Sequence, residues 1–257
     1  MESEYIEDLE LLDPQHFWFK AKEQYLRHLI KKPDATILDV GCGSGRNMAS
    51  FIKRHYKVIG IDINEQSVKL CQKKGYNVFK ADLENEIPDI RCTPDYITAF
   101  DFLEHIQRPV NFLSNLRKLA GNETQLIVTV PSYQSLFSGW DNAMGHVKRY
   151  RRPILCNELD KGGWQVIQAT YIHMLPLIPA IIIRKLFQPL KENFCSRTTV
   201  KREKFFTVSP LLNGFISKMY FPEFFFFESG WSLPFGLSVL AVASPKKNYI
   251  MKNLKQD

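Results

Sequence analysis

The sequence of 257 residues predicts an α/β protein built on a doubly wound, Rossmann-like sheet. Three observations predict this class. From residue 35 onward, short apolar runs alternate with longer segments in which apolar residues recur at helical spacing. A glycine-dense turn follows the first apolar run. Acidic residues recur where the apolar runs end, and such sheets bind ligands at the carboxyl ends of their strands.

The first expected element is an amphipathic helix over residues 14–30, which we assign to an N-terminal helical cap over residues 1–34. Large apolar residues recur in it at roughly helical spacing: Phe19, Tyr25, Leu26, Leu29 and Ile30. The sequence begins with an acidic stretch that lacks the apolar core of a secretory signal. The five cysteines are scattered and form no C-x-x-C pair. We therefore expect a cytoplasmic protein with reduced thiols.

A parallel sheet is expected next, because strand-like and helix-like segments alternate up to residue 172. Strands are expected over residues 35–40, 58–63, 77–81, 96–102, 124–130 and 164–172, and helices over residues 45–54, 65–74, 109–119 and 153–161. Pro109 suits a first helical turn, and Gly162 with Gly163 ends the last helix. Pro131 stops the fifth strand, and residues 131–152 are expected to form a loop.

A seventh strand is expected over residues 236–243, after a long insertion. We assign residues 35–173 and 233–246 to one cofactor-binding domain, and residues 174–232 to a hydrophobic and basic helical insertion.

The insertion is rich in aromatic residues, because 11 of the 19 Phe residues follow residue 180. Its apolar run over residues 174–187 contains Arg184 and Lys185 and is shorter than the about 20 apolar residues that a membrane-spanning helix needs. We expect interfacial helices or a lid over the acceptor, with packing in the core as the alternative.

The charge of the chain is asymmetric. Residues 1–143 hold 17 Lys and Arg against 20 Asp and Glu, a net charge of −3, whereas residues 144–257 hold 17 against 7, a net charge of +10. The basic part is either a solubilising face or a surface for an anionic partner, which would be a membrane, a phosphate-bearing lipid or a nucleic acid.

The glycine turn belongs to the segment T-I-L-D-V-G-C-G-S-G-R over residues 36–46. Gly41, Gly43 and Gly45 allow a sharp turn and a close approach of a ligand to the backbone. Their spacing is G-x-G-x-G, whereas the dinucleotide fingerprint is G-x-G-x-x-G. Asp39 precedes the glycines and suits a cofactor that carries an ammonium group better than one that carries phosphates.

Four acids end the first four strands: Asp39, Asp62, Asp82 and Asp101. Asp62 lies 21 residues after Gly41, where an acid can accept hydrogen bonds from both hydroxyls of a ribose. Asp82 lies where its carboxylate can accept from the exocyclic amine of an adenine, and Leu83 can pack on the ring. For any one of these acids, capping of a helix is the alternative role.

Four segments in this order resemble motifs I to IV of the class I S-adenosylmethionine (SAM) methyltransferases: D-V-G-C-G-S-G, G-I-D-I, K-A-D-L-E-N-E-I-P and D-Y-I-T-A-F-D-F-L-E-H-I. The resemblance covers about residues 35–243. It implies SAM as the cofactor, a strand order of 3-2-1-4-5-7-6 and an antiparallel seventh strand. The cofactor-binding residues that it implies are Asp39, Gly41, Cys42, Gly43, Gly45, Asp62, Ile63, Asp82, Leu83, Asp101 and Phe102.

Three flanking segments resemble a bacterial subfamily that is linked to cell-surface glycan and lipid pathways: H-F-W-F-K-A, G-H-V-K-R-Y-R-R-P and L-P-F-G-L-S-V-L-A-V-A. The resemblance implies that the first helix covers the cofactor pocket. Trp18 and Phe19 are then candidates for packing, and Lys20 for contact with an anionic group. Simple docking of this helix on the sheet is the alternative.

The candidate reaction centre follows the fourth strand. Glu104 and His105 come directly after it, and His146 follows the fifth strand at the same edge. These three are the candidate catalytic residues, since an imidazole can act as a base near neutral pH. Together with Asp101 they could instead hold Mg²⁺. This resembles the E-x-x-E-H metal site of some quinone and small-RNA methyltransferases, with Asp101 in place of the first Glu.

A basic run beside His146 comprises Lys148, Arg149, Arg151 and Arg152. It is either a binding site for a phosphate or lipid headgroup, or the solvated start of a helix.

The sequence therefore predicts a SAM-dependent methyltransferase that acts on oxygen. The expected acceptor is lipophilic, lipid-linked or a saccharide, and an anionic inner membrane face is a candidate surface for the basic insertion. An RNA methyltransferase and a non-catalytic membrane-associated binding protein are the alternatives. Nucleic acid is not the expected partner, because no recognisable RNA-binding module is present.

Overall fold

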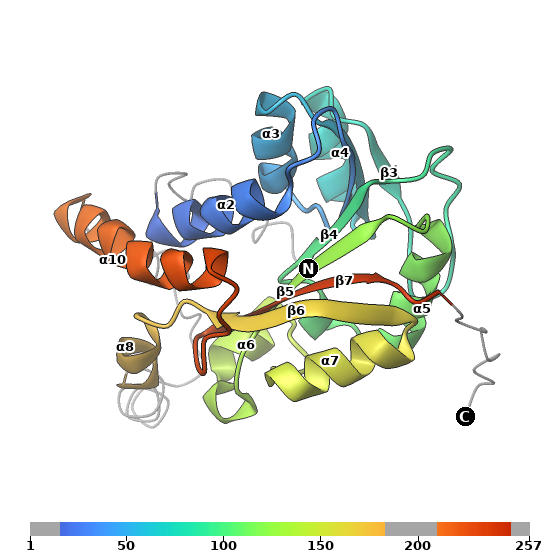
Figure 1. The fold of residues 1–257 in the computed structure, drawn as a ribbon. Coiled ribbons are helices and arrows are strands. Elements are labelled where there is room, and N and C mark those ends of the chain that lie inside the picture. The colour runs from blue at the N-terminus through green and yellow to red at the C-terminus, as the bar shows by residue number, and fades with distance from the viewer. Residues whose placement is uncertain (1–15, 183–209, 248–257) are drawn as a thin grey trace, which may run out of the picture.

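The computed structural model describes residues 16–182 and 210–247 (Figure 1). Its centre is a seven-stranded sheet in the order β3-β2-β1-β4-β5-β7-β6. The strands are β1 (Thr36–Val40), β2 (Lys57–Asp62), β3 (Val78–Lys80), β4 (Tyr96–Phe100), β5 (Gln125–Pro131), β6 (Trp164–Ile172) and β7 (Ser238–Pro245). Neighbouring strands from β3 to β5 pair in parallel, and β7 pairs antiparallel with both β5 and β6. The predicted fold class, strand order and direction of the seventh strand are confirmed.

The helices lie on both faces of this sheet (Figure 1). They are α2 (Phe17–Leu29), α3 (Arg46–Lys53), α4 (Glu65–Lys73), α5 (Pro109–Leu119), α6 (Gly139–Met144), α7 (Arg152–Lys161), α8 (Leu177–Ile182) and α10 (Pro210–Glu228), with short 3₁₀ turns η1 (Leu103–His105) and η2 (Gln134–Leu136).

Alternation along the strands explains the two layers of helices. In β1, Ile37 belongs to a buried cluster with residues of α2, α3, α4 and α10, whereas Leu38 and Val40 belong to a cluster with residues of α5 and α7. Because successive side chains of a strand point to opposite faces, the two clusters lie on opposite sides of the sheet. Every residue of β4 is buried, as expected for a strand in the middle of such a sheet.

Two expectations about local structure are wrong. The fourth strand was expected to reach residue 102, but it ends at Phe100, because Asp101 adopts a left-handed φ of 48° that a strand cannot continue. The expected loop over residues 131–152 contains η2 and α6. In α6 a capping box between Ser138 and Asp141 starts the helix, and Gly145 ends it with a φ of 77°.

The segment between β6 and β7 leaves and re-enters the sheet at one edge, because the carboxyl end of β6 and the start of β7 pair at Ile172 and Ser238. This edge is also where the parallel strands β1, β4 and β5 end. The predicted run over residues 174–187 is described only up to Ile182, so Arg184 and Lys185 lie outside the described residues. Among the described helices, none is long and apolar enough to cross a membrane.

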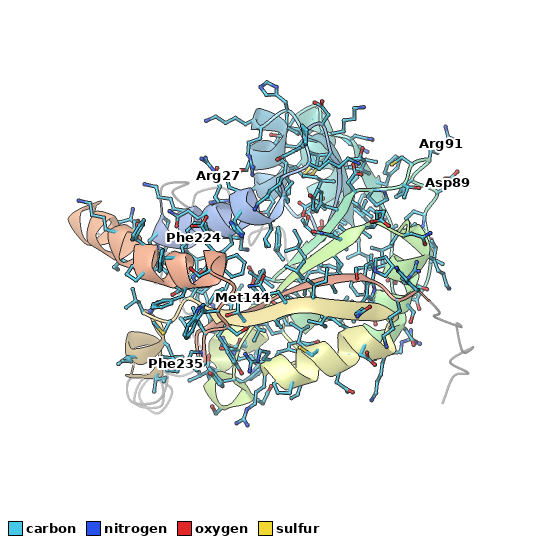
Figure 2. All side chains as sticks on the ribbon, in the orientation of Figure 1. Arg27, Asp89, Arg91, Met144, Phe224 and Phe235 are labelled. Carbon is cyan, nitrogen blue, oxygen red and sulfur yellow. The ribbon has the colours of Figure 1, made fainter. Side chains whose placement is uncertain are left out.

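Helices α2 and α10 pack against each other over the carboxyl edge of the sheet. The backbone N–H of Phe17 donates to Oδ1 of Asn213 at 2.7 Å, and the hydroxyl of Tyr25 donates to Oε1 of Glu223 at 2.7 Å. Phe224, labelled in Figure 2, lies between the two helices with its ring centroid 5.6 Å from that of Tyr25. The N-terminal helix and the end of the insertion therefore form one continuous cover.

Candidate active site

The glycine turn joins β1 to α3 at the carboxyl edge. Gly41, Gly43 and Gly45 all have positive φ angles, of 68°, 53° and 81°. A Cβ atom at Gly41 would meet the ring of Phe102 at 2.0 Å, and one at Gly45 would meet Sγ of Cys71 at 2.9 Å. A Cβ atom at Gly43 would meet nothing within 4 Å. The turn is therefore closed by packing at its two ends and open at its middle, where a ligand can approach the backbone.

Asp39 lies beneath this turn and is buried. Its Oδ1 accepts a hydrogen bond from Oγ1 of Thr98 at 2.7 Å, but Oδ2 has no hydrogen-bond partner among the described residues. Burial raises the pKa of Asp39 to about 7, against the lowering effects of Thr98 and Lys22. A buried acceptor of this kind fits a cationic donor such as an ammonium group.

Asp62 holds the open part of the turn in place. Its Oδ2 accepts from the backbone N–H of Gly43 at 2.8 Å, and its Oδ1 accepts from that of Asn64 at 2.8 Å. Burial raises the pKa of Asp62 despite these two bonds. The next side chain, Ile63, is 55% exposed and offers an apolar surface beside the carboxylate. A carboxylate can accept further bonds, so Asp62 remains able to bind hydroxyl groups.

The other predicted cofactor residues have structural partners of their own. Asp82 accepts from the backbone N–H of Glu84 at 3.1 Å and from Nδ2 of Asn85 at 2.6 Å, so it caps a turn. Leu83 is buried in the cluster under α5. The half-buried ring of Phe102 packs on that of Phe112, with centroids 5.3 Å apart.

Cys42 is buried in the cluster that contains Ile37, and its thiol hydrogen-bonds to that of Cys71. Only its backbone therefore faces the turn. The described cysteines are free thiols, and Cys195 lies outside the described residues.

Asp101 forms an ion pair that the sequence did not indicate. Its Oδ2 lies 2.6 Å from Nζ of Lys22, and its Oδ1 accepts from Oγ1 of Thr129 at 3.2 Å. Burial acts to raise the pKa of Asp101, but the charge and hydrogen bond of Lys22 outweigh it and lower that pKa. Lys20, the expected cation of this helix, is exposed. Helical spacing could have indicated Lys22 from the sequence, since Lys22 follows Trp18 by one turn and lies on the same face of the helix.

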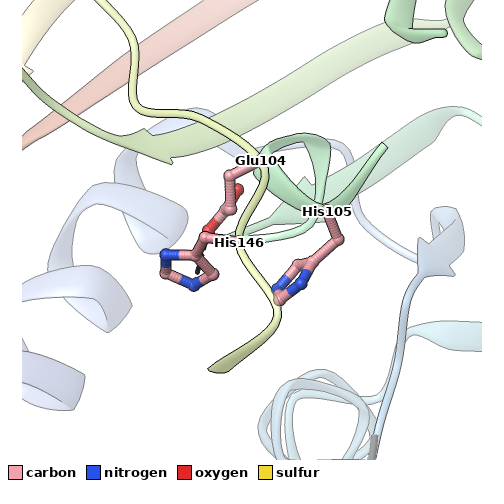
Figure 3. A group of neighbouring side chains, drawn as sticks. All are labelled: Glu104, His105 and His146. Carbon is pink, nitrogen blue, oxygen red and sulfur yellow. Dashed lines mark ion pairs between the residues drawn. The ribbon is translucent and has the colours of Figure 1, made fainter. Parts of the chain in front are cut away.

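Glu104, His105 and His146 meet beside this pair (Figure 3). Glu104 and His105 come from η1, and His146 comes from the loop after α6. Nε2 of His146 lies 3.9 Å from Oε1 of Glu104, and the two imidazole centroids are 4.8 Å apart. Neither oxygen of the Glu104 carboxyl has a hydrogen-bond partner on another described residue. The structure thus brings together the three predicted catalytic residues.

The titration of this cluster is set by its surroundings. Burial and the charge of Asp101 raise the pKa of Glu104 well above its ordinary value, so the carboxyl stays protonated at a pH where exposed glutamates are ionised. Burial and the neighbouring His146 lower the pKa of His105 to about 4, so its imidazole is neutral at pH 7.

The predicted Mg²⁺ ligands do not fit that ion. Ligand atoms of Glu104, His105 and His146 lie within 4.8 Å of one another, but Asp101 is bound to Lys22 instead. Mg²⁺ prefers octahedral oxygen ligands, whereas this set offers one carboxyl and two imidazoles.

No sequence motif indicated three further residues around the site, which are His173, Tyr220 and Glu223. His173 directly follows β6, stacks on Trp18 with centroids 3.8 Å apart, and has Nδ1 2.9 Å from the hydroxyl of Tyr220. Burial lowers the pKa of His173 to about 3, so it is neutral. Glu223 accepts from the backbone N–H groups of His173 and Met174, at 2.6 and 2.9 Å, in addition to Tyr25. These contacts join α2, β6 and α10 into one wall beside Asp101.

The basic run after His146 is not one continuous cationic surface. Arg149 is buried and donates to Oδ1 of Asp141 at 2.7 Å and to the carbonyl of Ser132 at 3.1 Å. Lys148 pairs with Glu158 at 2.6 Å. Arg151 is exposed and Arg152 half-buried at the start of α7. The expected phosphate site would therefore lack two of its four members.

The sheet order, the open glycine turn, the unpartnered Asp39 and the carboxylate of Asp62 together define a class I SAM methyltransferase. A family model described as methyltransferase domain matches residues 13–169, and the chain belongs to this family. It is thus a SAM-dependent methyltransferase.

Among curated relatives, the ubiquinone biosynthesis O-methyltransferase of Coxiella burnetii (strain RSA 331 / Henzerling II) is 24% identical over 185 residues, which cover 65% of this chain and 79% of the relative. Among solved structures, a SAM-dependent methyltransferase from Archaeoglobus fulgidus has a TM-score of 0.56 and 18% identity, covering 89% of this chain and 94% of that one. One from Aquifex aeolicus has a TM-score of 0.51 and 24% identity, covering 66% and 93%.

Proposed function

We propose that this methyltransferase methylates a hydroxyl group of a lipophilic small molecule, and that Nε2 of His146 accepts the hydroxyl proton. The observation that carries the proposal is the 3.9 Å approach of Nε2 to the buried, otherwise unpartnered carboxyl of Glu104. A hydroxyl at this place would donate to Nε2 and accept from the protonated Glu104. When bound, SAM supplies an electrophilic methyl group, which bonds to the hydroxyl oxygen as its S–C bond breaks.

His146 is preferred as the base because its two neighbours are poorly suited. Burial and the charge of Asp101 raise the pKa of Glu104, which favours its protonated form, so its role in our proposal is to orient the hydroxyl. His105 is a weak base, with a pKa of about 4, and packs edge-on against His146. The hypothesis of Mg²⁺ at this cluster has no support from the donor set, and no step of the proposal uses a metal.

For the cofactor end, the residues present fit SAM. In our proposal Oδ2 of Asp39 receives the ammonium group, the backbone at Gly43 lies along the methionine part and Asp62 binds the ribose hydroxyls. Ile63 packs on the adenine. The remaining predicted contacts, which involve Gly41, Gly45, the backbone of Cys42, Asp82, Leu83, Asp101 and Phe102, stay part of this proposal.

The lipophilic character of the acceptor is inferred from the wall opposite the cofactor end. Trp18 stacks there on His173, which is buried beside Tyr220. Of these three side chains only the half-buried Trp18 can contact an acceptor, and the contact it offers is aromatic and uncharged. The Coxiella relative is named for O-methylation in ubiquinone biosynthesis, which supports a hydroxyl acceptor here. A lipid-linked or saccharide acceptor is the other class that the sequence suggested.

We further propose peripheral contact with an anionic membrane from the cytoplasmic side. Helix α10 buries Tyr220, Glu223 and Phe227, whereas Phe221 and Phe225 are 70% and 56% exposed on its other side. Other exposed apolar side chains nearby in the sequence are Ile178, Phe226, Trp231 and Phe235. Lys218 precedes Phe221 by nearly one turn and is exposed, which suits an anionic headgroup.

Flotation with phosphatidylglycerol vesicles tests this contact. We expect the wild-type protein to float and a Phe221→Ser/Phe225→Ser variant to stay in the dense fraction. Ile167→Ser is the matched control, because Ile167 is 58% exposed on β6, outside the insertion. A wild-type protein that stays in the dense fraction would contradict the membrane proposal and leave the methyl transfer unaffected.

An assay with radiolabelled SAM and dodecyl catechol, with catechol as the water-soluble comparison, tests the main proposal. We expect label in the dodecyl catechol, and we expect His146→Ala to lower kcat by about 10²- to 10⁴-fold while SAM binding is kept. His105→Asn should have a much smaller effect. Full activity of His146→Ala would refute the assignment of the base.

The basic run beside His146 gives the RNA alternative little support, because Arg149 is buried and Lys148 is paired with Glu158. Salt-sensitive binding of RNA followed by labelling of the RNA would revive it.

A further inference from the structure

Asp141 is a fully buried acid in the first turns of α6, and nothing in the sequence pointed to it as part of the site. Its Oδ1 lies 2.9 Å from Nδ1 of His146 and 2.7 Å from Nε of Arg149. Its Oδ2 lies 3.0 Å from the backbone nitrogen of Ser138 and 3.2 Å from Oγ of that residue. The two oxygens thus serve two different groups of partners.

The chemistry of these partners fixes the protons. A guanidinium N–H and a backbone N–H can only donate, so both carboxylate oxygens of Asp141 act as acceptors. Nδ1 of His146 meets the same Oδ1 as Arg149. An acceptor oxygen requires a donor, so the proton of this imidazole must lie on Nδ1. The lone pair then lies on Nε2, the nitrogen that faces Glu104 at 3.9 Å.

We propose that Asp141 is a positioning residue that holds His146 in the Nδ1–H tautomer and so presents the Nε2 lone pair to the acceptor hydroxyl. This inference rests on the proposed function for its consequence in catalysis. The tautomer itself follows from the contacts of Asp141 alone.

The neighbouring imidazole of His105 is held in the same tautomer. Nδ1 of His105 lies 3.1 Å from the carbonyl oxygen of Gly145, which can only accept. The neutral ring therefore donates from Nδ1 and also has its lone pair on Nε2. Both contacts come from the short segment that α6 and its closing Gly145 form. The same segment thus sets which nitrogen each histidine exposes.

A purely structural role of Asp141 can be separated from this one, because the helix cap uses Oδ2 and the histidine uses Oδ1. Ser138→Ala removes the hydroxyl contact to Oδ2 and leaves the histidine contact in place. It is therefore the matched control for Asp141→Leu, which removes the acceptor oxygen from Nδ1 and supplies no donor in its place.

Nitrogen-15 NMR of the full chain, labelled at histidine and loaded with S-adenosylhomocysteine, tests the proposal. His146→Gln identifies the signals of His146. We expect the Nδ1–H pattern in the wild type and in Ser138→Ala. We expect Asp141→Leu to shift His146 toward the Nε2–H pattern and to lower kcat by about 10²-fold or more, with the KM for SAM unchanged.

An Nε2–H pattern in the wild-type enzyme would overturn the proposal without any variant, so a misfolded Asp141→Leu protein does not leave it undecided. An unchanged tautomer in a folded Asp141→Leu protein would overturn it as well. Full activity of His146→Ala would instead refute the proposed base while leaving the measured tautomer intact, so the two failures are distinguishable.

Discussion

Nζ of Lys22 lies 2.6 Å from Oδ2 of Asp101, which joins the N-terminal helix to the carboxyl end of β4 at the centre of the site. The two charges act on Glu104 in opposite senses, since the charge of Asp101 raises the pKa of that carboxyl and the charge of Lys22 lowers it.

Loss of this pair is expected to destabilise the protein. Lys22→Met leaves the Asp101 carboxylate without its cation, and we expect a cost of about 1–3 kcal/mol in the free energy of unfolding, below the value for a fully buried pair because the Asp101 side chain is 38% exposed. Urea denaturation measures the change. Lys20→Met, at an exposed position of the same helix, should cost almost nothing, and equal costs for the two variants would contradict the importance of the pair.

Two alanine substitutions in the glycine turn should fail in different ways. Gly41→Ala places a Cβ atom 2.0 Å from the ring of Phe102 and should destabilise the fold. Gly43→Ala meets no atom within 4 Å, so it should fold at a cost of about 1–2 kcal/mol for its left-handed φ. It should nevertheless lose SAM binding, since the added methyl occupies the open face. Calorimetric titration and thermal melts separate the two effects, and normal SAM affinity in Gly43→Ala would show that the cofactor does not approach this backbone.

The raised pKa of Asp39 predicts how stability and SAM affinity depend on pH. Burial raises this pKa from 3.8 to about 7, so the folded state favours the protonated carboxyl and the stability that this provides is lost as the pH rises from about 4 to 7. An ammonium ligand favours the ionised carboxylate, so SAM affinity should rise over the same range. Asp39→Asn should flatten both trends and weaken SAM binding at pH 8 by about 10- to 100-fold. If the SAM affinity of Asp39→Asn keeps the pH dependence of the wild type, that dependence belongs to the titration of another group.

Removal of divalent metal should leave activity unchanged. Asp101 is bound to Lys22, and the remaining donor set does not suit Mg²⁺. Dialysis against EDTA followed by the methyl-transfer assay checks this, with Mg²⁺ added back to one half of the sample. Loss of activity that Mg²⁺ restores would contradict the metal-free mechanism.

The fold could be predicted from the sequence because its signals are local. The strand over Trp164–Ile172 and the helix over Pro109–Leu119 have the bounds expected from their apolar runs and flanking Pro and Gly residues. The end of β4 was misplaced, because the left-handed backbone of Asp101 depends on its surroundings in three dimensions. Helix α6 is only six residues long and depends on its capping box, so it lacks the apolar periodicity that reveals a longer helix.

Only the part of the candidate site that lies in local motifs could be located from the sequence. Asp39, Gly43 and Asp62 lie in local motifs, whereas the Lys22–Asp101 pair joins residues that are 79 positions apart in the chain. Asp141 lacked any motif, and its role becomes visible only when the loop folds back so that His146 and Arg149 meet one carboxylate oxygen.

The entry and exit of the insertion at one end of β6 and β7 have an evolutionary consequence. Strand β7 pairs with β5 on one side and with β6 on the other, so hydrogen bonds fix both β6 and β7 along their lengths. The chain between Ile172 and Ser238 can therefore change in sequence without altering the register of the sheet. The residues that we propose to bind the nucleoside lie at the ends of β1 and β2, on the far side of β4 and β5 from the insertion. If the insertion contacts the acceptor as proposed, selection can change the acceptor while the cofactor affinity is inherited unchanged.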